Sequence, residues 1–367
     1  PGAGHHRGHE RSSEGGMTQA SASPAATPGG GAELSESRKR WLTFLIKGRS
    51  FAVLGVLAVL IVFFSLGTEN FATPESFRSI TVNAALLAII ACGEGIVILT
   101  RNYDISIGSI LGLAAYVSYD WGQLYPEFSM VLVPAIAIGI GIVCGAINGL
   151  LVAYARIPSI AATLGTLSVF RGVLFIYGDG RIVTPENIPR WAQDLVSTQV
   201  FGAVASLVII ATVTIAVAAL FLRYFSIGRQ IYAVGSNPDA APFYGLDQRG
   251  VVFRAYVLCG LLAGFAGFLF GAQVSYIIQY AGQNMELLAI AAVVIGGISV
   301  LGGTGHIFGA AFGALTLATI DNGLIQMQLP EFARLVIQGG VIILAVMLDA
   351  VVQRQARSIL RSMRRRG

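Results

Sequence analysis

Charged residues are scarce in this chain, and that scarcity decides its class. Only 12% of the 367 residues are charged, whereas 55% are hydrophobic. Soluble domains carry about 25% charged residues, so this chain cannot cover a water-facing surface. Apolar runs such as 128–155 and 201–222 reach the roughly 20 residues that a helix needs to cross a bilayer core. The composition therefore predicts an all-α polytopic membrane protein.

Metal-binding and catalytic patterns are scarce too. Three of the four histidines lie in the first ten residues, which leaves His306 in the body of the chain. Cys92, Cys144 and Cys259 lie inside apolar runs, at spacings that fit neither a metal site nor a disulfide framework. The sequence carries no nucleophile with its base, no paired carboxylates and no nucleotide-binding fingerprint. We therefore expect no cofactor, no metal and no enzymatic activity.

The chain divides into a leader, a membrane part and a tail. Residues 1–42 are rich in Gly, Ser, Ala, Pro and charge, which predicts disorder. Residues 1–16 are a candidate non-native extension, with Met17 a candidate start, and we expect no cleaved signal peptide. The remaining parts are a transmembrane domain at 43–351, its polar loop at 223–250 and a basic tail at 352–367.

Ten apolar segments predict about ten transmembrane helices. We expect them at 43–67, 80–99, 106–121, 128–155, 158–177, 200–222, 251–275, 286–303, 306–325 and 332–351. The third segment is short. Residues 101–106 are therefore either a loop between two helices or a break within one.

The distribution of Lys and Arg predicts the orientation, because these residues stay on the cytoplasmic side of short loops. With the N-terminus inside, seventeen of them lie on the cytoplasmic side. The opposite side holds four, namely Arg78, Arg181, Arg190 and Arg334. We therefore expect both termini and the loop at 223–250 to be cytoplasmic, and the basic charge needs no nucleic-acid partner.

A polar segment interrupts the apolar pattern between the second and third runs. It includes Asn102, Asp104 and Ser106, followed by a Gly-rich apolar stretch. Asp104 or Ser106 is well placed to cap a helix N-terminus. The other interpretation is a broken helix that lines a hydrophilic cavity, where irregular backbone is tolerated at membrane depth.

Two ionisable residues, Glu94 and Arg171, lie within apolar runs, where such groups are costly and predict function. We expect both to face the bundle interior, although Arg171 fits snorkelling toward the outer interface equally well. Thr163, Thr166 and Phe170 share one helical face at i, i+3 and i+7. That face suits a polyhydroxylated solute in a pathway. The alternative is that both threonines bond neighbouring backbone or helices and Phe170 packs in the bundle.

Two loops carry unusual patterns. The Gly-rich turn in 296–313 echoes 97–114, as either a decayed internal repeat or a chance similarity, and it lacks the Lys-Ser or Lys-Thr of a phosphate loop. The segment 228–250 keeps Gly, Asn, Pro and an Ala-Ala pair between two spans. It is either an ordinary connection or a docking surface for a cytoplasmic motor.

Four segments together resemble the permease subunits of bacterial ABC importers of the ribose, xylose, rhamnose and autoinducer-2 type. They are Leu99–Gly112, Ile157–Thr184, Tyr232–Gly245 and Gly296–Gly323, and the resemblance covers roughly 45–350. It implies a type II ABC importer-like fold in the bacterial cytoplasmic membrane, with about ten helices forming half of a dimeric pathway. The implied partners are cytoplasmic ATPase subunits, an extracytoplasmic solute-binding protein and a second permease, identical or related.

The resemblance implies a coupling role for one loop, whereas the pathway and docking candidates come from the residues themselves. A coupling helix that docks on the ATPase is expected at about Asn237–Leu246, with the candidates Gly235, Asn237, Pro238, Ala240, Ala241, Gly245 and Leu246. The candidates for the pathway are Glu94, Asn102, Asp104, Thr163, Thr166, Phe170 and Arg171. Arg181 and Arg190 dominate the positive charge of the longest external loop and are expected to seat the binding protein.

One segment narrows the range of possible solutes. Many sugar permeases of this group have Gly-Gly-Ile-Asp where this chain has Arg101-Asn-Tyr-Asp104, a form similar to autoinducer-2 and rhamnose permeases, although Tyr103 departs from the expected aliphatic residue. We expect import of such a solute. The alternatives are a nucleoside or amino-acid permease, an exporter, and a H⁺- or Na⁺-coupled transporter using Glu94, Asp104 or Asp321.

Overall fold

The structure, a computed structural model, describes residues 2, 49–200, 204–344, 346 and 347. Apart from residue 2, the predicted leader and tail lie outside this part. Its longer helices are α2 (Arg49–Gly67), α3 (Pro74–Leu99), α4 (Ile107–Leu124), α5 (Ser129–Gly149), α6 (Ser159–Gly178), α8 (Ser206–Tyr224), α10 (Gln248–Val274) and α12 (Ile307–Gln326). The shorter elements are η1 (Pro126–Phe128), η2 (Leu150–Tyr154), η3 (Pro185–Asn187), α7 (Arg190–Ser197), β1 (Gln199–Val200), β2 (Val204–Ala205), α9 (Ser226–Ser236), η4 (Ala241–Tyr244) and α11 (Met285–Ile295). Residues 331–344 are also helical.

Six of the described helical segments are long and apolar enough to cross a membrane. They are α3, α5 with its flanking turns, α6, α8, α10 and α12. The apolar part of α2 and the whole of α11 are shorter. The chain is therefore an all-α polytopic protein with a helix at each predicted position, but the predicted count of about ten spans is not confirmed.

The eighth predicted segment ends earlier than expected. The sequence predicts it to run to residue 303, whereas α11 stops at Ile295. Gly297, Gly302 and Gly303 have φ values of 87°, 75° and 71°, in the left-handed region that ends a helix. Apolar composition alone does not reveal that turn.

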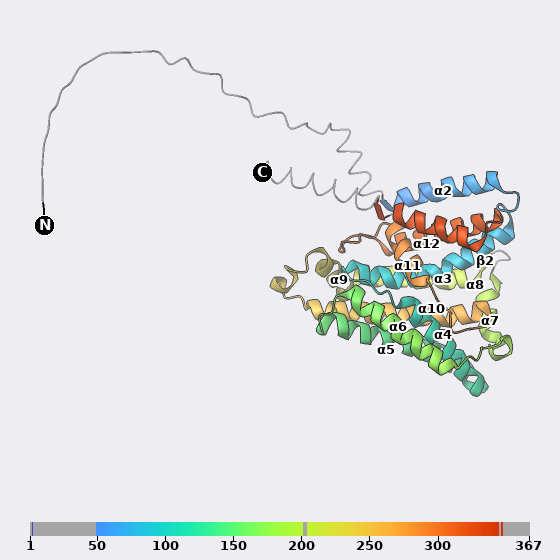
Figure 1. Cartoon of the computed structure of the whole chain (residues 1–367), viewed down its shortest axis with the longest axis horizontal. Helices are drawn as coiled ribbons and strands as arrows, with labels where there is room; N and C mark the ends of the chain where they lie inside the picture. The colour runs from blue at the N-terminus through green and yellow to red at the C-terminus, as the bar shows by residue number, and fades with distance from the viewer. Residues whose placement is uncertain (1, 3–48, 201–203, 345, 348–367) are drawn as a thin grey trace, which may run out of the picture. The chain divides into compact units, whose positions relative to one another are not determined.

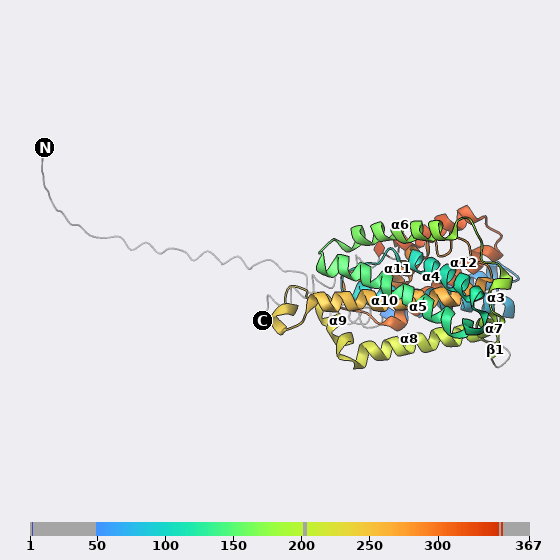
Figure 2. The same ribbon diagram turned by 90° about the horizontal axis from the view of Figure 1, so that it is seen from below.

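Helix α3 forms the centre of the bundle. In its apolar stretch 89% of the residues are buried, against 22% in that of α8. Figure 1 shows α3 between the α2 and α12 pair and the group of α4, α5 and α10, and Figure 2 shows α8 on one side of α10 and α6 on the other. Few positions on α3 are therefore free to contact lipid.

Close packing of α5 on α10 explains part of the high glycine content. Gly141 and Gly145 face Gly260 and Gly264 so closely that a Cβ at any of the four would meet backbone atoms of the other helix. Small residues in membrane helices allow this approach, because they remove the side chains that would separate the backbones. The packing brings the C-terminal part of α5, including Asn148, to the N-terminal end of α4, next to the polar segment.

Candidate functional site

The segment between α3 and α4 is a break within the bundle. Residues 100–106 leave the helical path, and Arg101 adopts the left-handed conformation, with φ 67°. That conformation favours glycine, because a Cβ makes it unfavourable. Ser106 is the N-cap residue of α4, but its side chain makes no capping hydrogen bond. Its N and Oγ instead donate to Asp104 Oδ1 at 3.0 Å and 2.6 Å. The predicted capping bond from Asp104 or Ser106 to the first turn of α4 is therefore absent among the described residues, and Asp104 holds the residue just before the helix.

Two predicted pathway residues, Glu94 and Asp104, meet in a buried polar cluster. Glu94 Oε1 accepts a hydrogen bond from Asp104 N at 3.1 Å. Asn148 Nδ2 lies 3.1 Å from both carboxylate oxygens of Asp104 and 2.7 Å from Ser106 Oγ. All four side chains are fully buried. Within the described part, Glu94 Oε2 and Asn148 Oδ1 have no hydrogen-bond partner.

Asn148 is a site residue that the sequence interpretation missed. An amide inside the apolar run 128–155 was the available signal, because polar groups within lipid-spanning helices are costly unless they are bonded. The cluster joins α3, α4 and α5 around the break. It lies inside protein rather than on an open cavity, so its direct contribution is to hold the break in one conformation.

Asn102 lies instead on an open hollow of about 710 Å³. The hollow is bordered by the start of α6, the start of α10 and the segment before α10, including Ser159, Leu246 and Arg249. One predicted pathway residue and one predicted coupling residue thus share a surface. The other predicted pathway residues do not line this hollow.

The hydroxyl and aromatic face of α6 is packed against the break. Thr163, Thr166 and Phe170 are all buried. Thr163 Oγ1 accepts a hydrogen bond from Ile105 N at 3.1 Å and donates one to Ser159 O at 2.8 Å. Thr166 Oγ1 donates to Thr163 O at 3.3 Å. These contacts match the alternative in which the threonines bond backbone, and the pathway role of this face stays a prediction.

The opposite face of α6 is open and includes four small residues. Added Cβ atoms at Gly165 and Gly172 would meet no atom within 4 Å in the described part of the chain. Ala161 and Ser168 are exposed on the same face. The sequence interpretation did not single out this face, although the spacing of its small residues is visible in the sequence.

Arg171 lies at the edge of the buried face and is half-buried. Its Nη1 donates to Gln279 O at 3.1 Å and to Ala281 O at 2.6 Å. The guanidinium therefore binds the loop between α10 and α11 to α6. This arrangement differs from both a free snorkelling side chain and a group in an open pathway.

The predicted coupling loop is more helical than expected. Helix α9 occupies its first part and η4 its second, whereas the sequence predicts a polar loop with one short helix. Asn237 separates the two, and its Oδ1 accepts a hydrogen bond from Ala240 N at 3.1 Å. Gly245 follows η4 in the left-handed conformation, with φ 73°. Gly228 and Gly235 permit the extra helix to pack, because both lie directly against backbone atoms.

Exposure within η4 differs from what the predicted coupling residues imply. Ala241 is 3% exposed, whereas Phe243 and Tyr244 are 90% and 83% exposed. Two aromatic side chains therefore project where the sequence analysis placed small residues. The Pro-Phe-Tyr sequence between polar residues was the signal, and the apolar character of the rest of the chain hid it.

The predicted coupling loop is bonded directly to the break. Arg101 Nε donates to Gly235 O at 2.6 Å, and Arg101 Nη2 donates to Ser236 O at 2.7 Å. Gly303 N donates to Leu99 O at 2.9 Å, which adds the Gly-rich turn to the same junction. A displacement of α9 would therefore be transmitted to the segment that carries Asn102.

The family model described as the permease component of the branched-chain amino acid transport system matches residues 76–346. The chain belongs to this permease family. It is therefore a membrane component of a transport system.

Curated relatives of the permease cover most of its length. It is 36% identical over 308 residues to the autoinducer 2 import system permease protein LsrC of Yersinia pseudotuberculosis serotype O:1b (strain IP 31758), covering 82% of this chain and 86% of that protein. The same-named protein of Yersinia enterocolitica serotype O:8 is also 36% identical, with 82% and 84% covered. That of Yersinia pestis (strain Pestoides F) is 35% identical, with 82% and 86% covered. No solved structure matches the permease significantly.

The predicted docking residues Arg181 and Arg190 lie at the end of the permease opposite to η4. Both are exposed, and Arg190 is the first residue of α7. Arg181 Nη1 lies 4.0 Å from Asp120 Oδ1, and its Nη2 donates to Tyr177 O at 3.1 Å. Arg181 is therefore partly held by its own chain, whereas Arg190 begins an amphipathic helix on the surface.

Proposed function

We propose that this permease is the membrane subunit of an ATP-driven importer for a sugar-like solute, of which an autoinducer-2-like or rhamnose-like molecule is favoured. The observation that carries the proposal is the 36% identity, over 82% of the chain, to proteins named as autoinducer 2 import permeases. The Arg101 to Asp104 segment supports the same substrate group, because its form is similar to that of autoinducer-2 and rhamnose permeases.

The energy source in this proposal is an ATPase bound at η4. Phe243 and Tyr244 supply the exposed aromatic anchors that dominate many protein interfaces. Arg101 connects α9 to the break through two short hydrogen bonds. ATP-driven movement of the ATPase would then shift the populations of outward-open and inward-open states by acting on this junction.

The pathway in this proposal runs between two permease subunits. The interior of one subunit is filled by α3 and its neighbours, which supports a path at a subunit boundary. Gly165, Ser168 and Gly172 on the open face of α6 are small enough to let a second subunit approach while leaving room for a solute. Asn102 borders the hollow at the predicted cytoplasmic exit, and the buried cluster around Asp104 holds the break.

Reconstitution tests the proposal directly. The permease, its ATPase subunits and its second permease would be reconstituted in liposomes with the ATPase facing the interior. The binding protein would be added outside, and ATP would be enclosed inside. We expect uptake that requires both ATP and the binding protein, with competition by autoinducer 2 or rhamnose but not by nucleosides or branched-chain amino acids. Uptake by the permease alone, driven by a H⁺ or Na⁺ gradient, would instead support the secondary-transporter alternative.

A further inference from the structure

The hollow beside Asn102 is positively charged, and the described part of the chain does not neutralise it. Arg156 and Arg249 border this hollow of about 710 Å³, and both are exposed. Neither side chain makes an ion pair or a hydrogen bond to another described residue. Asp247 also borders the hollow, but its Oδ2 lies against Gly250, in the first turn of its own helix. The described lining therefore carries excess positive charge.

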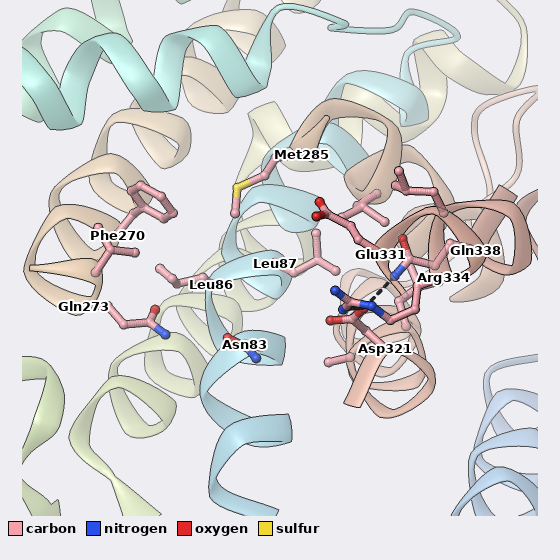
Figure 3. A pocket seen from close by; sticks show the side chains of 15 residues that line it. Asn83, Leu86, Leu87, Phe270, Gln273, Met285, Asp321, Glu331, Arg334 and Gln338 are labelled. Atoms are coloured by element: carbon pink, nitrogen blue, oxygen red, sulfur yellow. Dashed lines mark hydrogen bonds and ion pairs between the residues drawn. The ribbon is translucent and has the colours of Figure 1, made fainter. Parts of the chain in front are cut away.

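A second pocket, of about 350 Å³ at the other end of the bundle, is different (Figure 3). Its Arg334 Nη1 lies 3.1 Å from Asp321 Oδ1, and Gln338 Nε2 donates to the same oxygen at 2.8 Å. Figure 3 shows Gln273 on the wall opposite to these three. The arginine of this pocket is therefore paired within the chain, and the same bonds disfavour Asp321 as a carboxylate for ion coupling.

Arg156 has a backbone conformation that is unfavourable for any residue with a Cβ. Its φ is 60°, in the left-handed region that favours glycine. Arg101 has a similar φ of 67°, but its side chain offsets the cost with hydrogen bonds to α9. The side chain of Arg156 makes no such bond in the described part of the chain. An unfavourable conformation that the chain itself does not compensate indicates a functional role for the side chain, with a partner outside the chain.

The backbone around the hollow adds to its preference for negative charge. Helices α6 and α10 both begin at its edge, with Ser159 and Gln248 as their first residues. Neither helix has a side-chain hydrogen bond that caps its first turn. The N–H groups at such helix ends attract anions and act together with nearby positive side chains. Two arginines and two helix ends therefore converge on one hollow.

The hollow is continuous with η4. Pro242 of η4 and Leu246, which follows it, border the hollow, while Phe243 and Tyr244 project from the same element. A protein that binds these two aromatic side chains therefore reaches the hollow as well. The amide of Gln248 in the lining can bond the backbone of an extended peptide. These features favour a protein segment as the occupant.

We propose that the hollow receives an acidic segment of the ATPase, as a second contact beside η4. The inference rests on the proposed function, in which the ATPase binds η4. Carboxylates of the segment pair with Arg156 and Arg249, because the planar guanidinium group matches a carboxylate with two parallel hydrogen bonds. The segment then lies beside Asn102, at the cytoplasmic exit of the proposed pathway. A movement of the ATPase that withdraws the segment would open that exit.

Binding of the ATPase to the permease in lipid nanodiscs tests the contact. Arg156→Gly with Arg249→Gln removes both charges, and the fold should tolerate the change because Gly suits φ 60° and Arg249 is exposed. We expect the affinity at low salt to fall roughly tenfold or more and its salt dependence to become shallower. The control is Arg223→Gln, since Arg223 is exposed near the end of α8 but does not border the hollow. Unchanged affinity, or an equal loss in the control, would overturn the proposal.

A second measurement detects the acidic partner directly and does not depend on the double variant. Arg249→Lys keeps the positive charge and provides an amine, which a water-soluble carbodiimide joins to a carboxylate in contact with it. We expect a covalent adduct with the ATPase, joined at an acidic residue that mass spectrometry would locate. The matched control is Arg223→Lys, and the parent chain gives the background from its own lysines. An adduct no more abundant than in these two controls would contradict the acidic segment.

Anionic lipid is the alternative occupant. Phosphatidylglycerol would then co-purify with the parent chain but not with the double variant, while the ATPase would bind both equally. That result would assign the hollow to lipid headgroups and overturn the proposal.

The hollow and the proposed function fail differently. If the double variant binds the ATPase like the parent chain and the complete complex still imports with ATP and the binding protein, the hollow proposal is wrong and the importer proposal stands. If the parent chain binds the ATPase through the hollow but uptake needs neither ATP nor the binding protein, the contact stands and the importer proposal is wrong.

Discussion

At the scale of single residues, the main feature is how buried polar groups are satisfied. Asp104 is fully buried, yet it receives hydrogen bonds from Ser106 N, Ser106 Oγ and Asn148 Nδ2. Removing one partner of such a group costs more than the bond itself, because the remaining group stays buried and unpaired. Asn148 is the partner of Asp104 that comes from another helix, so it is the residue whose loss the cluster tolerates least.

Replacing Asn148 with Ala should therefore destabilise the permease. We expect a loss of about 1–3 kcal/mol, the usual cost of leaving a buried polar group without its partner. Thermal unfolding of the purified permease in detergent, followed by fluorescence size-exclusion chromatography, would measure it. The control is Asn70→Ala, because Asn70 is exposed in the turn after α2. Equal unfolding temperatures for the two variants would contradict the role of Asn148.

Arg101 combines an unfavourable backbone conformation with a specific contact. Left-handed backbone costs a residue with a Cβ about 1–2 kcal/mol, and the bonds to Gly235 and Ser236 offset that cost. Arg101→Gly relieves the strain and removes the bonds, so the fold should survive the substitution. That property makes it a cleaner test of coupling than a substitution by Ala.

We expect Arg101→Gly to lower the stimulation of ATP hydrolysis by the binding protein at least tenfold, because it removes two charge-assisted hydrogen bonds. Basal hydrolysis by the assembled complex should change little. Gln328→Gly is a matched control, since Gln328 also has a left-handed backbone, with φ 58°, but it follows α12 and makes no hydrogen bond to α9 in the described part. Stimulation that is normal in Arg101→Gly, or lost equally in both variants, would rule out a transmitting contact.

At the scale of elements, α9, η4, the α3–α4 break and the Gly-rich turn form one junction. Tyr232 OH donates to Gly305 O at 3.0 Å, and Tyr103 OH donates to Val300 O at 3.2 Å. Tyr256 OH on α10 donates to Tyr103 O at 2.8 Å. Each bond joins segments that are distant in the chain. The junction can therefore move as a unit, with the exposed tip of η4 as its outermost point.

The aromatic residues at that tip should be needed to hold the ATPase. Truncating an interface aromatic residue commonly costs about 2 kcal/mol or more, which weakens binding by roughly 30-fold. We expect a loss of at least this size for Phe243→Ala with Tyr244→Ala, measured by surface plasmon resonance between the permease in nanodiscs and the ATPase. Ala241→Arg is a poorer test, because Ala241 is buried and an Arg there would disturb η4 itself.

The matched control replaces Tyr125 and Phe128 with Ala. These residues are also exposed aromatics, but they lie between α4 and α5 at the other end of the bundle. The control should bind the ATPase like the parent chain. Wild-type affinity in the Phe243 and Tyr244 double variant would mean that the ATPase docks elsewhere.

At the scale of the whole molecule, the two ends of the bundle differ in chemistry. One end has the hollow at Asn102 and the exposed tip of η4, and the other has the 350 Å³ pocket, α7 and Arg181 with Arg190. The proposed import direction runs from the second end to the first. Arg190 has more freedom than Arg181 to meet a binding protein, because Arg181 is close to Asp120.

Removing the charges of Arg181 and Arg190 should slow docking of the binding protein. We expect Arg181→Gln with Arg190→Gln to reduce the association rate at low salt and to flatten its salt dependence, because rim charges mainly steer encounter. Gln is preferred to Glu, since a carboxylate at 181 would be repelled by Asp120. Stopped-flow measurements would use Arg223→Gln, at the opposite end, as the control. An unchanged salt dependence would contradict electrostatic steering.

Much of the fold could be predicted because lipid imposes a local rule. Each spanning helix must satisfy its own backbone and present apolar side chains, so the runs of apolar residues predict a helix at each position without knowledge of the neighbours. The count of spans could not be fixed in this way. Helices such as α11 are shortened by tertiary packing at the glycines of the following turn, which composition does not report.

The sequence by itself determined the membrane class, the positions of the helices and the resemblance to the permease family, because these depend on local composition and on motif order. Tertiary structure decided which face of α6 is buried, that Asn148 reaches Asp104, and that Phe243 rather than Ala241 is exposed. It also decided that Gln273 and Arg334 border one pocket. Each of these facts depends on contacts between segments far apart in the chain. The local sequence does not show which distant residue a side chain will contact.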